Sequence, residues 1–334
     1  MVMLFLSKIN LLFTYIRIGP QFGFSSPVFF AWVLMFEPFH LASDELKEKP
    51  YVTCPLHGQL GNQMHEIATT LAYAWDHKMV PLFPDLKNKN YNLFMNYERI
   101  FFRLDASPLP RPILHTFEQD QNFEKIEIPV KQDLCLKGYF QTWEYFHHHR
   151  DKILDVFSPR FEELNLIKSK HADLLSHPCT VGVHVRTFNK EWSKVFPFVG
   201  LDYYARAMSL FPSETLFVVF SDRINWCKHH FLKFSEKIIF IEMQDHIEDF
   251  ILMSMLKHNI IGNSSYSWWA GYLNRNANKI VIAPSHFVHP DLRPKVNANM
   301  PDWIVLDIDY DYRYSSYPED ILEYDFVSSS IDTQ

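Results

Sequence analysis

The sequence predicts an α/β protein built from parallel β-sheets. From Val181 onward, short apolar runs alternate with longer stretches that have helical periodicity, which is the pattern of consecutive βα units. Such units place their strands in a parallel sheet joined by right-handed crossovers. The chain has 334 residues, which exceeds the usual size of one hydrophobic core, and its 47% hydrophobic content is enough for two. We therefore expect two α/β domains.

The expected elements follow a regular order in the second half. Strands are expected at 181–185, 216–220, 238–241, 259–261 and 280–283, and helices at 201–210, 224–234, 246–256 and 265–275. Asp245 followed by Glu248 has the pattern of a capping box for the third of these helices. The first half has an expected strand at 51–54, an amphipathic helix around 67–75, a proline-rich loop at 105–112 and a helix beginning at Pro159. The predicted domains are 51–175 and 176–306, between an N-terminal hydrophobic segment at 1–50 and a C-terminal tail at 307–334.

The N-terminal segment has features of a membrane anchor. Residues 18–36 carry no charge, Lys8 and Arg17 precede them and Glu37 follows, which is typical of a signal anchor with its amino terminus in the cytoplasm. Only residues 28–36 are continuously apolar, a length that suits a signal-peptide core or an interfacial segment equally well. A misannotated start or a soluble extension are the remaining interpretations.

Charge and cysteine content exclude several classes of partner. The net charge of −7 argues against a nucleic-acid partner, which requires a basic face. The four cysteines are widely separated and form no Cys-x-x-Cys pair, so we interpret them as free thiols. The triplet 147–149 (HHH) lies in a predicted helix, where consecutive side chains diverge, so we expect a solvated face and no zinc site there.

An anion-binding segment is indicated where the expected strand 259–261 ends. The residues from Gly262 to Ser267 are mostly small hydroxyl and amide residues, and they open the expected helix 265–275. A helix N-terminus offers free backbone N–H groups and the positive end of the helix dipole, which suit a phosphate. An ordinary Asn or Ser helix cap is the alternative interpretation.

A second candidate lies at the end of strand 181–185. His184 and Arg186 are two residues apart, so on a strand they project from the same face. At the carboxyl end of a parallel strand, that face borders the crevice where open α/β sheets bind ligands. The guanidinium of Arg186 can donate two parallel hydrogen bonds to a phosphate. The alternative interpretation is that Arg186 forms an ordinary surface ion pair.

A third candidate is the glycine-containing turn after strand 51–54. Gly58 and Gly61 allow the backbone to approach a ligand, and Asn62 and Gln63 bring amide groups to the start of a helix. A Gly-x-x-Gly turn is a weak signal by itself, so its interpretation depends on the other two segments.

Together these segments resemble glycosyltransferase family 11, the α-1,2-fucosyltransferases. The resemblance is carried, in chain order, by 58–63 (GQLGNQ), 184–186 (HVR), 220–227 (FSDRINWC) and 263–269 (NSSYSWW). The stretches 201–204 (LDYY) and 279–284 (KIVIAP) are similar to bacterial members. The resemblance covers residues 51–306 and implies the GT-B arrangement of two facing Rossmann-like domains, which the alternating pattern also favours.

Three segments depart from the family pattern. Where the family usually reads His-x-Arg-Arg-Gly-Asp, residues 184–189 read HVRTFN, so the second arginine, the glycine and the aspartate are absent. The usual Ser-Asp-Asp appears as SDR at 221–223, and the usual Gln-Leu-Phe-Gln appears as QMHE at 63–66. These changes leave the first arginine, Arg186, available for donor binding. Any role that the aspartate has in other family members is lost in this chain.

The resemblance implies an inverting transfer of L-fucose from GDP-β-L-fucose to the 2-OH of a galactoside in a glycan, without a metal or other cofactor. Arg186 would stabilise the diphosphate leaving group, supported by Asn263, Ser264, Ser265 and Ser267 with nearby backbone amides. Asp222 or His184 would accept hydrogen bonds from guanine. From the other domain, Gly61, Asn62 and Gln63 would approach the fucose or the glycosidic oxygen.

The general base is the least defined group, because the family's aspartate is missing. Glu66, His65 and Glu191 are the candidates, and Trp268 and Trp269 are expected to pack into the core. Asn263 heads the only Asn-x-Ser/Thr sequon and lies inside the phosphate segment, which favours a bacterial-type protein with a cytoplasmic catalytic domain. That protein would be associated with the membrane through residues 18–36, or else soluble.

Two other functions remain open at this stage. The altered arginine and aspartate positions are compatible with an inactive relative that binds GDP-fucose or glycans. Asp307 and Asp309 form an Asp-x-Asp pattern, as in metal-dependent transferases of the GT-A kind. That pattern lies beyond the last expected strand, so we favour exposed acidic residues that close the domain.

Overall fold

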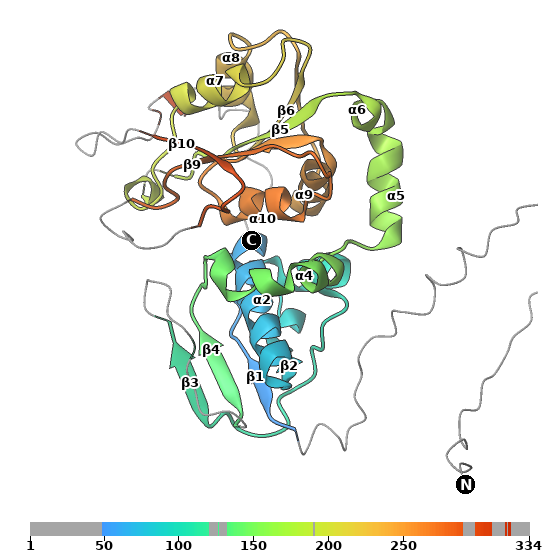
Figure 1. Cartoon of the computed structure of the whole chain (residues 1–334), viewed down its shortest axis with the longest axis vertical. Helices are drawn as coiled ribbons and strands as arrows, with labels where there is room; N and C mark the ends of the chain where they lie inside the picture. The colour runs from blue at the N-terminus through green and yellow to red at the C-terminus, as the bar shows by residue number, and fades with distance from the viewer. Residues whose placement is uncertain are drawn as a thin grey trace, which may run out of the picture. The chain divides into compact units, whose positions relative to one another are not determined.

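The protein has two parallel β-sheets, each accompanied by helices (Figure 1). The computed structural model describes residues 49–119, 126, 132–189, 191–289, 298–308, 318, 320 and 321. Both sheets belong to one compact unit of the described chain. The predicted fold class, α/β with two Rossmann-like halves and parallel sheets, is confirmed.

The first sheet has the strand order β2-β1-β4-β3, and all its pairings are parallel. Its strands are β1 (Tyr51–Thr53), β2 (Val80–Leu82), β3 (His115–Glu118) and β4 (Leu134–Lys137). Helix α2 (Leu60–His77) follows β1, and the apolar side chains along it, Leu60, Met64, Ile67 and Leu71, are buried. It ends where Lys78 adopts a left-handed conformation and its N–H bonds to the carbonyl of Ala74.

Short helices complete this half and lead to the second sheet. Between β2 and β3 lie η2 (Pro84–Lys87), η3 (Asn90–Asn92), α3 (Leu93–Asn96) and η4 (Tyr97–Phe101). After β4 come η5 (Trp143–Tyr145), η6 (His147–His149), α4 (Arg150–Val156), α5 (Phe161–Lys170) and α6 (Ala172–Ser176). The helix expected to begin at Pro159 is therefore present as α5.

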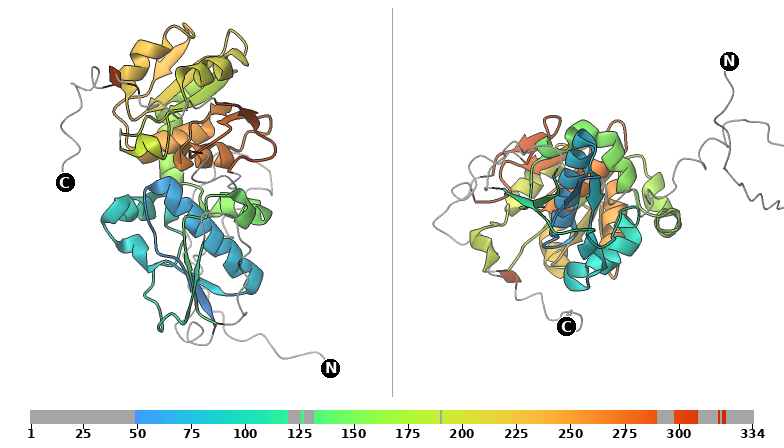
Figure 2. Two further views of the ribbon diagram at one scale, coloured as in Figure 1. Left: turned by 90° about the vertical axis from the view of Figure 1, so that its left-hand side faces the viewer. Right: turned by 90° about the horizontal axis from the view of Figure 1, so that it is seen from below.

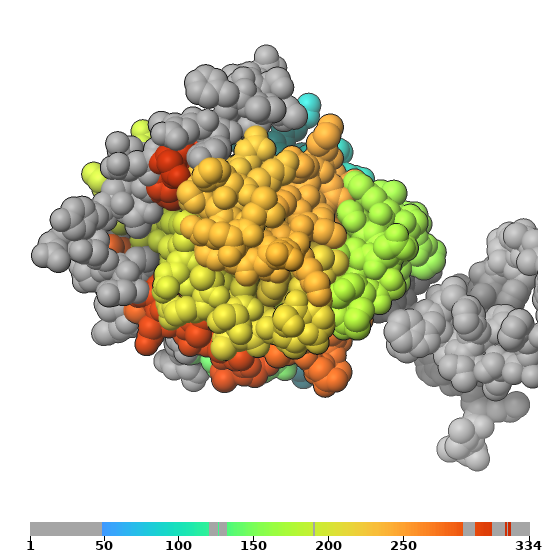
Figure 3. All heavy atoms as spheres, turned by 90° about the horizontal axis from the view of Figure 1, so that it is seen from above, coloured from blue at the N-terminus to red at the C-terminus, as the bar shows by residue number. Residues whose placement is uncertain are grey.

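The second sheet has the order β10-β9-β8-β5-β6-β7, again with parallel pairing. Its strands are β5 (Thr180–Val185), β6 (Leu216–Ser221), β7 (Ile238–Phe240), β8 (His258–Ile260), β9 (Val281–Pro284) and β10 (Ile304–Leu306). The helices are α7 (Leu201–Ser209), α8 (Ile224–Phe231), α9 (His246–Met255) and α10 (Ser265–Leu273). Figure 3 looks onto the end of the molecule where α7 and α8 lie, with α5 and α6 in green beside them.

Both sheets contain a point where the chain changes direction across the sheet. In the second sheet, β6 and β7 lie on one side of β5, and β8, β9 and β10 lie on the other side. In the first sheet β1 likewise lies between β2 and β4. Open α/β sheets bind ligands at the carboxyl ends of the strands that flank such a switch point. The relevant ends are those of β5 and β8 in one sheet, and of β1 and β4 in the other.

The largest apolar cluster connects the two halves. It contains residues of the first sheet, such as Val52 and Leu134, together with Val218 and Ile261 of the second. A separate cluster around Val183, between β5, α7 and α8, belongs to the second half alone. Because one cluster includes residues from both sheets, the domain boundary at residues 175/176 stays a prediction.

The predicted membrane segment, residues 18–36, lies outside the described residues, as does most of the predicted tail 307–334. Among the helices of the described ranges, none is long and apolar enough to cross a membrane.

Candidate active site

The first turns of α2 and α10 meet at Gly61. Helix α2 is drawn in blue in both views of Figure 2. A Cβ atom on Gly61 would lie 2.5 Å from the carbonyl carbon of Ser265 and 2.5 Å from the amide nitrogen of Tyr266. The second glycine of the GQLGNQ segment is therefore required by contact with the backbone of α10. Two helix N-termini approach each other here, and both direct positive dipole ends toward this region.

Asn62 connects three segments at the same place. Its Oδ1 accepts hydrogen bonds from Ser265 Oγ and from Gln141 Nε2, each at 2.9 Å. Gln141 follows β4, so the bond joins the carboxyl ends of β1 and β4 at the switch point of the first sheet. No recognisable motif surrounds Gln141, and its position in an irregular loop explains why it was not among the predicted residues.

The turn after β8 packs against the end of β5. A Cβ atom on Gly262 would lie 3.1 Å from the carbonyl oxygen of His184 and 3.7 Å from the backbone nitrogen of Arg186. Close approach of the two backbones therefore brings the HVR segment beside the NSSYSWW segment. Three segments that are far apart in the sequence thus converge at the switch points of the two sheets.

Arg186 lies directly after β5 with a half-buried side chain. Its Nη1 is 3.2 Å from Asp222 Oδ2, and its guanidinium lies 5.2 Å from the ring centre of Phe188. The side chain is 41% exposed. A guanidinium has five N–H donors, and this single contact with Asp222 occupies only part of them.

Asp222 orders the loop that follows Arg186. Its Oδ1 accepts hydrogen bonds from the backbone N–H and the hydroxyl of Thr187, at 3.1 and 3.3 Å. Thr187 occupies the position of the family's second arginine. Both oxygens of the predicted guanine acceptor are thus engaged by residues 186 and 187, so binding of guanine by Asp222 would require sharing or rearranging these bonds.

His184, the other predicted guanine acceptor, is a buried neutral imidazole. Burial, together with the nearby charge of Arg186, lowers the pKa of His184 to about 3. Its Nδ1 is buried and has no hydrogen-bond partner within the described ranges, and its ring lies 5.4 Å from that of Tyr266. A neutral ring nitrogen can accept a hydrogen bond from a ligand, which keeps the prediction open.

The predicted phosphate segment contains both structural and accessible groups. Asn263 is buried and its Nδ2 donates to the carbonyl of Pro197 at 2.7 Å, while Ser267 is buried and donates to the carbonyl of Ser264. Ser264 is the N-cap residue of α10 and makes no side-chain capping bond. Ser264 and Ser265 are half-buried, so they are the hydroxyls of this segment that a ligand can reach.

Gln63 is buried and bonded within the protein. Its Nε2 donates to the carbonyls of Gly58 and Tyr91, and its Oε1 accepts from Asn96 Nδ2 at 2.7 Å. These bonds use both amide hydrogens, so Gln63 holds the turn at residue 58 in place. Contact with a donor, as predicted for Gln63, would break bonds that the turn needs.

Two of the three candidate bases are buried inside the protein. Glu66 is fully buried, and burial raises its pKa to about 9; its Oε2 accepts from the backbone N–H of His57 at 3.0 Å. Burial also lowers the pKa of His65 to about 4, and its Nδ1 accepts from Trp269 Nε1 at 2.8 Å. Glu191, which precedes η7 (Trp192–Lys194), is exposed.

The expected core positions and thiols agree with the structure. Trp268 and Trp269 are almost completely buried, as predicted. The four cysteines are free, although only Cys54 and Cys227 are fully buried.

For the histidine triplet, the expected divergence of the side chains was wrong, whereas the exposed position expected for the triplet is present at His148. Residues 147–149 form one turn of 3-10 helix, and the side chains of His148 and His149 converge on Asp76 instead of diverging. The turn is tighter than the expected α-helix, and Asp76 lies opposite it at the end of α2. A sequence pattern shows neither the tighter turn nor the partner.

The Asp-x-Asp pattern lies only partly in the described chain. Asp307 follows β10, and its carbonyl accepts from Arg206 of α7 at 2.7 Å, beside a cavity of about 610 Å³. Asp309 and Asp311 lie outside the described residues.

Comparison with known proteins finds the predicted family. The sequence model described as Glycosyl transferase family 11 matches residues 114–307. The alpha-1,2-colitosyltransferase of Escherichia coli is 29% identical over 267 residues, covering 70% of this chain and 91% of that protein. Galactoside alpha-(1,2)-fucosyltransferase 2 of Oryctolagus cuniculus is 26% identical over 270 residues, covering 74% of each. Among solved structures, fucosyltransferase NodZ from Bradyrhizobium is similar with a TM-score of 0.48 and 12% identity, over 66% of this chain and 93% of that chain.

The family match covers more than half of the sequence and includes β5, β6 and the β8–α10 turn. These elements carry the HVR, FSDRINWC and NSSYSWW segments that meet at the candidate site. The chain belongs to glycosyl transferase family 11.

Proposed function

We propose that this protein transfers L-fucose from GDP-β-L-fucose to the 2-OH of a galactoside, with inversion at the anomeric carbon. The observation that carries the proposal is the convergence of the GQLGNQ, HVR and NSSYSWW segments at the switch points of the two sheets. Family membership and the galactoside fucosyltransferase among the relatives support it.

The proposed chemistry requires stabilisation of the GDP leaving group. As the bond between fucose and diphosphate breaks, negative charge grows on the phosphate oxygens. The guanidinium of Arg186 and the free N–H groups at the start of α10 would take that charge, with the Ser264 hydroxyl as a further donor. These groups are fixed by the fold, so little reorganisation accompanies the reaction.

Asn62 is the proposed group that orients the reacting sugar. Because its Oδ1 accepts bonds from both Ser265 and Gln141, the side-chain amide has a fixed direction. Its Nδ2 then acts as the donor toward the glycosidic oxygen or a fucose hydroxyl.

Glu191 is the proposed general base, in place of the aspartate that the family usually has. Of the three candidates it has the accessible carboxyl, whereas Glu66 and His65 are buried. Transfer of the acceptor proton to a positioned carboxylate contributes roughly two to four orders of magnitude in rate. A Glu191→Gln variant should therefore lose kcat with little change in GDP affinity. An unchanged kcat would remove Glu191 from the mechanism.

The function is tested by transfer assays with defined donors and acceptors. Purified protein is incubated with GDP-fucose and a panel of β-galactosides, and the linkage of each product is mapped by NMR. GDP-colitose is a second donor arm, because a colitosyltransferase is among the relatives. A 2-linked α-fucosyl product is expected. Binding of GDP-fucose without transfer or hydrolysis would instead support the inactive, ligand-binding alternative.

Arg186 variants test the donor site within the same assay. GDP at about a hundred times its dissociation constant should stabilise the wild type by roughly 2.7 kcal/mol, measured by thermal unfolding. Arg186→Ala should abolish this shift, and Arg186→Lys should fail as well, because an ammonium cannot reproduce the planar fork. Arg275→Ala is the control, since Arg275 is a more exposed arginine that pairs with Asp155. An unchanged shift in Arg186→Ala would contradict the assignment.

We also propose that residues 18–36 attach the protein to a membrane, with the catalytic part in the cytoplasm. The uncharged run and the basic residues before it support this proposal.

A further inference from the structure

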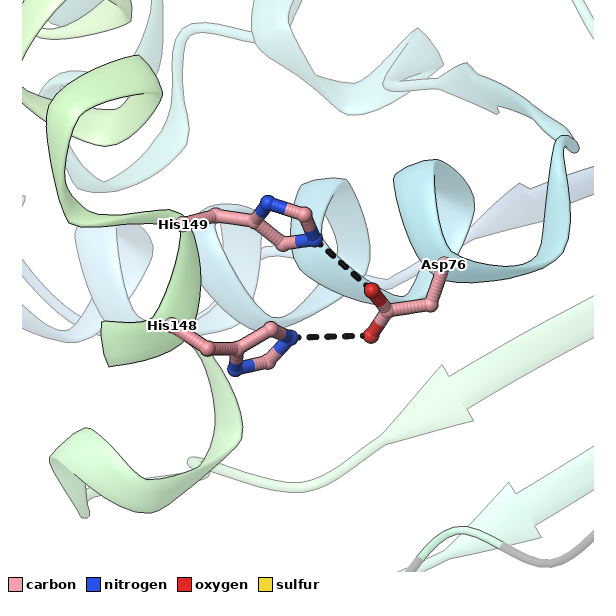
Figure 4. Close-up of side chains that lie close together, drawn as sticks. All are labelled: Asp76, His148 and His149. Carbon is pink, nitrogen blue, oxygen red and sulfur yellow. Dashed lines mark hydrogen bonds and ion pairs between the residues drawn. The ribbon is translucent and has the colours of Figure 1, made fainter.

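Two histidines and an aspartate come together at the C-terminal end of α2 (Figure 4). His148 Nε2 lies 2.9 Å from Asp76 Oδ2, and His149 Nε2 lies 2.7 Å from Asp76 Oδ1. Asp76 is the second-last residue of α2, and both histidines belong to η6. None of the three takes part in the proposed transfer reaction.

The composition of this cluster is that of a transition-metal site. Two imidazole nitrogens and one carboxylate oxygen suit Zn²⁺, whereas Mg²⁺ and Ca²⁺ prefer oxygen ligands alone. One ligand atom from each residue can be chosen so that all three lie within 4.8 Å of one another. Ligands at about 2.0–2.1 Å from a tetrahedral zinc ion lie roughly 3.3 Å apart. The ligand atoms of the cluster, which lie within 4.8 Å of one another, would therefore shift to that spacing when an ion binds.

We propose that Asp76, His148 and His149 bind one Zn²⁺ ion, with water in the remaining position. In the metal-free arrangement, each imidazole Nε2–H donates to the carboxylate of Asp76. When Nε2 binds the cation, a neutral imidazole carries its proton on Nδ1, so both histidines can bind without becoming charged. The side chains of Asp76 and His148 are 41% and 48% exposed, so the ion and its water are accessible from solvent.

The proposed ion lies away from the residues of the transfer reaction. Asp76 lies fourteen residues beyond Asn62 on the same helix, which is about 21 Å along its axis. The ion would join the end of α2 to η6 and to α4, which begins at Arg150. Arg150 in turn donates to the carbonyl of Tyr272 in α10 at 3.2 Å. Zinc would therefore stabilise the packing of these elements without contacting the donor.

The test is zinc binding by the tag-free protein after dialysis against chelator. Calorimetric titration with ZnCl₂ should give one ion per chain, and Co²⁺ should give the visible absorption of a bound ion. Asp76→Asn, His148→Gln and His149→Gln should each weaken binding by at least about tenfold, since even second-shell changes cost that much. His147→Gln is the matched control, because His147 belongs to the same turn but its Nδ1 lies 3.3 Å from Tyr272 Oη.

Circular dichroism establishes that each variant is folded before its titration. Zinc should also raise the unfolding temperature of the wild type and of His147→Gln, but not of the other three variants. The proposal is overturned if the wild type binds no zinc, or if the three variants bind it as the wild type does. Loss of binding in His147→Gln alone would overturn it as well. None of these outcomes depends on fucosyl transfer.

Discussion

Gly61 has no room for a side chain, because the backbone of α10 lies where its Cβ would be. We expect Gly61→Ala to destabilise the protein by about 1–3 kcal/mol and to reduce transfer, since the first turns of α2 and α10 must separate. Urea unfolding and kcat/KM measure the two effects. Gly271→Ala is the control: its Cβ would lie 3.2 Å from a methyl group of Val281, which can move. Equal effects of the two substitutions would show that the backbone contact at Gly61 is unimportant.

Glu66 should make stability depend on pH. Burial raises its pKa to about 9, whereas a glutamate in an unfolded chain ionises near pH 4.3. Between these values the unfolded state binds fewer protons than the folded state, so this group makes the free energy of unfolding fall as pH rises. Glu66→Gln removes that dependence.

The variant should therefore be as stable as the wild type at about pH 4 and increasingly more stable from there to about pH 9, by roughly 1.4 kcal/mol per pH unit at most. Urea titrations of both proteins at several pH values measure the difference, and transfer activity should be retained. A constant difference across pH would contradict the raised pKa. A loss of kcat by two or more orders of magnitude would restore Glu66 as the general base.

The residue scale also shows where sequence patterns stop being informative. Arg186 and Asn62 lie where their motifs placed them, because strand ends and helix starts follow from the alternating pattern. Gln63 and Glu66 belong to the same segment but are buried, since α2 is packed on most of its sides. Whether a polar residue on such a helix is buried depends on the elements that pack around the helix. The local sequence of the segment does not show those elements.

At the level of elements, Asp245 begins α9 and links it to the first half. Its Oδ1 accepts from the backbone N–H groups of Ile247 and Glu248 at 2.8 and 2.9 Å, and its Oδ2 pairs with Arg99 of η4. We expect Asp245→Ala to cost about 1 kcal/mol through the lost cap. The lost ion pair should add less than about 1 kcal/mol, because Asp245 is partly exposed.

Asp245→Asn separates the two contributions, because asparagine caps a helix as well as aspartate does but carries no charge. Unfolding in urea should place its stability between the wild type and Asp245→Ala. If Asn and Ala destabilise equally, the cap contributes nothing and the contact with Arg99 accounts for the whole effect.

Elements with strong periodicity were predictable, and irregular ones were not. Every expected strand and helix after residue 181 is present within a few residues of its predicted bounds. The N-cap at Asp245 is also present, although Glu248 pairs with Lys170 and does not complete the capping box. Among the missed elements, β10 and the 3-10 turns such as η6 are three or four residues long and too short to show a period.

For the whole molecule, the described motifs all lie after residue 50, and the described residues that carry them belong to one compact unit. Deletion of residues 1–42 should therefore leave a folded protein with full transfer activity, whereas the full-length chain should sediment partly with membranes. Fractionation of cells that express each form, followed by activity assays, tests both expectations. A full-length chain that stays intact and entirely in the supernatant would contradict the membrane proposal, and an inactive truncated protein would show that the first segment contributes to the fold.

The strand order explains how short segments that are weak signals by themselves come together in one site. Arg186 and the turn at Gly262 meet because β5 and β8 are neighbours at the switch point of the second sheet. Asn62 and Gln141 meet because β1 and β4 are neighbours in the first. The pattern of the sequence predicts parallel sheets but not which strands lie side by side, so these pairings could be inferred only through the family resemblance.

The same arrangement leads us to expect transfer without a divalent cation. The proposed diphosphate site has the positive charge of Arg186 and the N-termini of α2 and α10, which would take the role that a metal ion has in other transferases. We therefore expect the rate of fucosyl transfer to be unchanged in excess EDTA, and Asp307→Asn and Asp309→Asn to be as active as the wild type. The assay temperature must stay well below the unfolding temperature, so that removal of zinc from Asp76, His148 and His149 affects stability but not rate. If EDTA abolishes transfer and Mn²⁺ or Mg²⁺ restores it, the helix N-termini and Arg186 are insufficient to stabilise the leaving group. If the two aspartate variants also lose activity, the metal-dependent Asp-x-Asp mechanism replaces the proposed one.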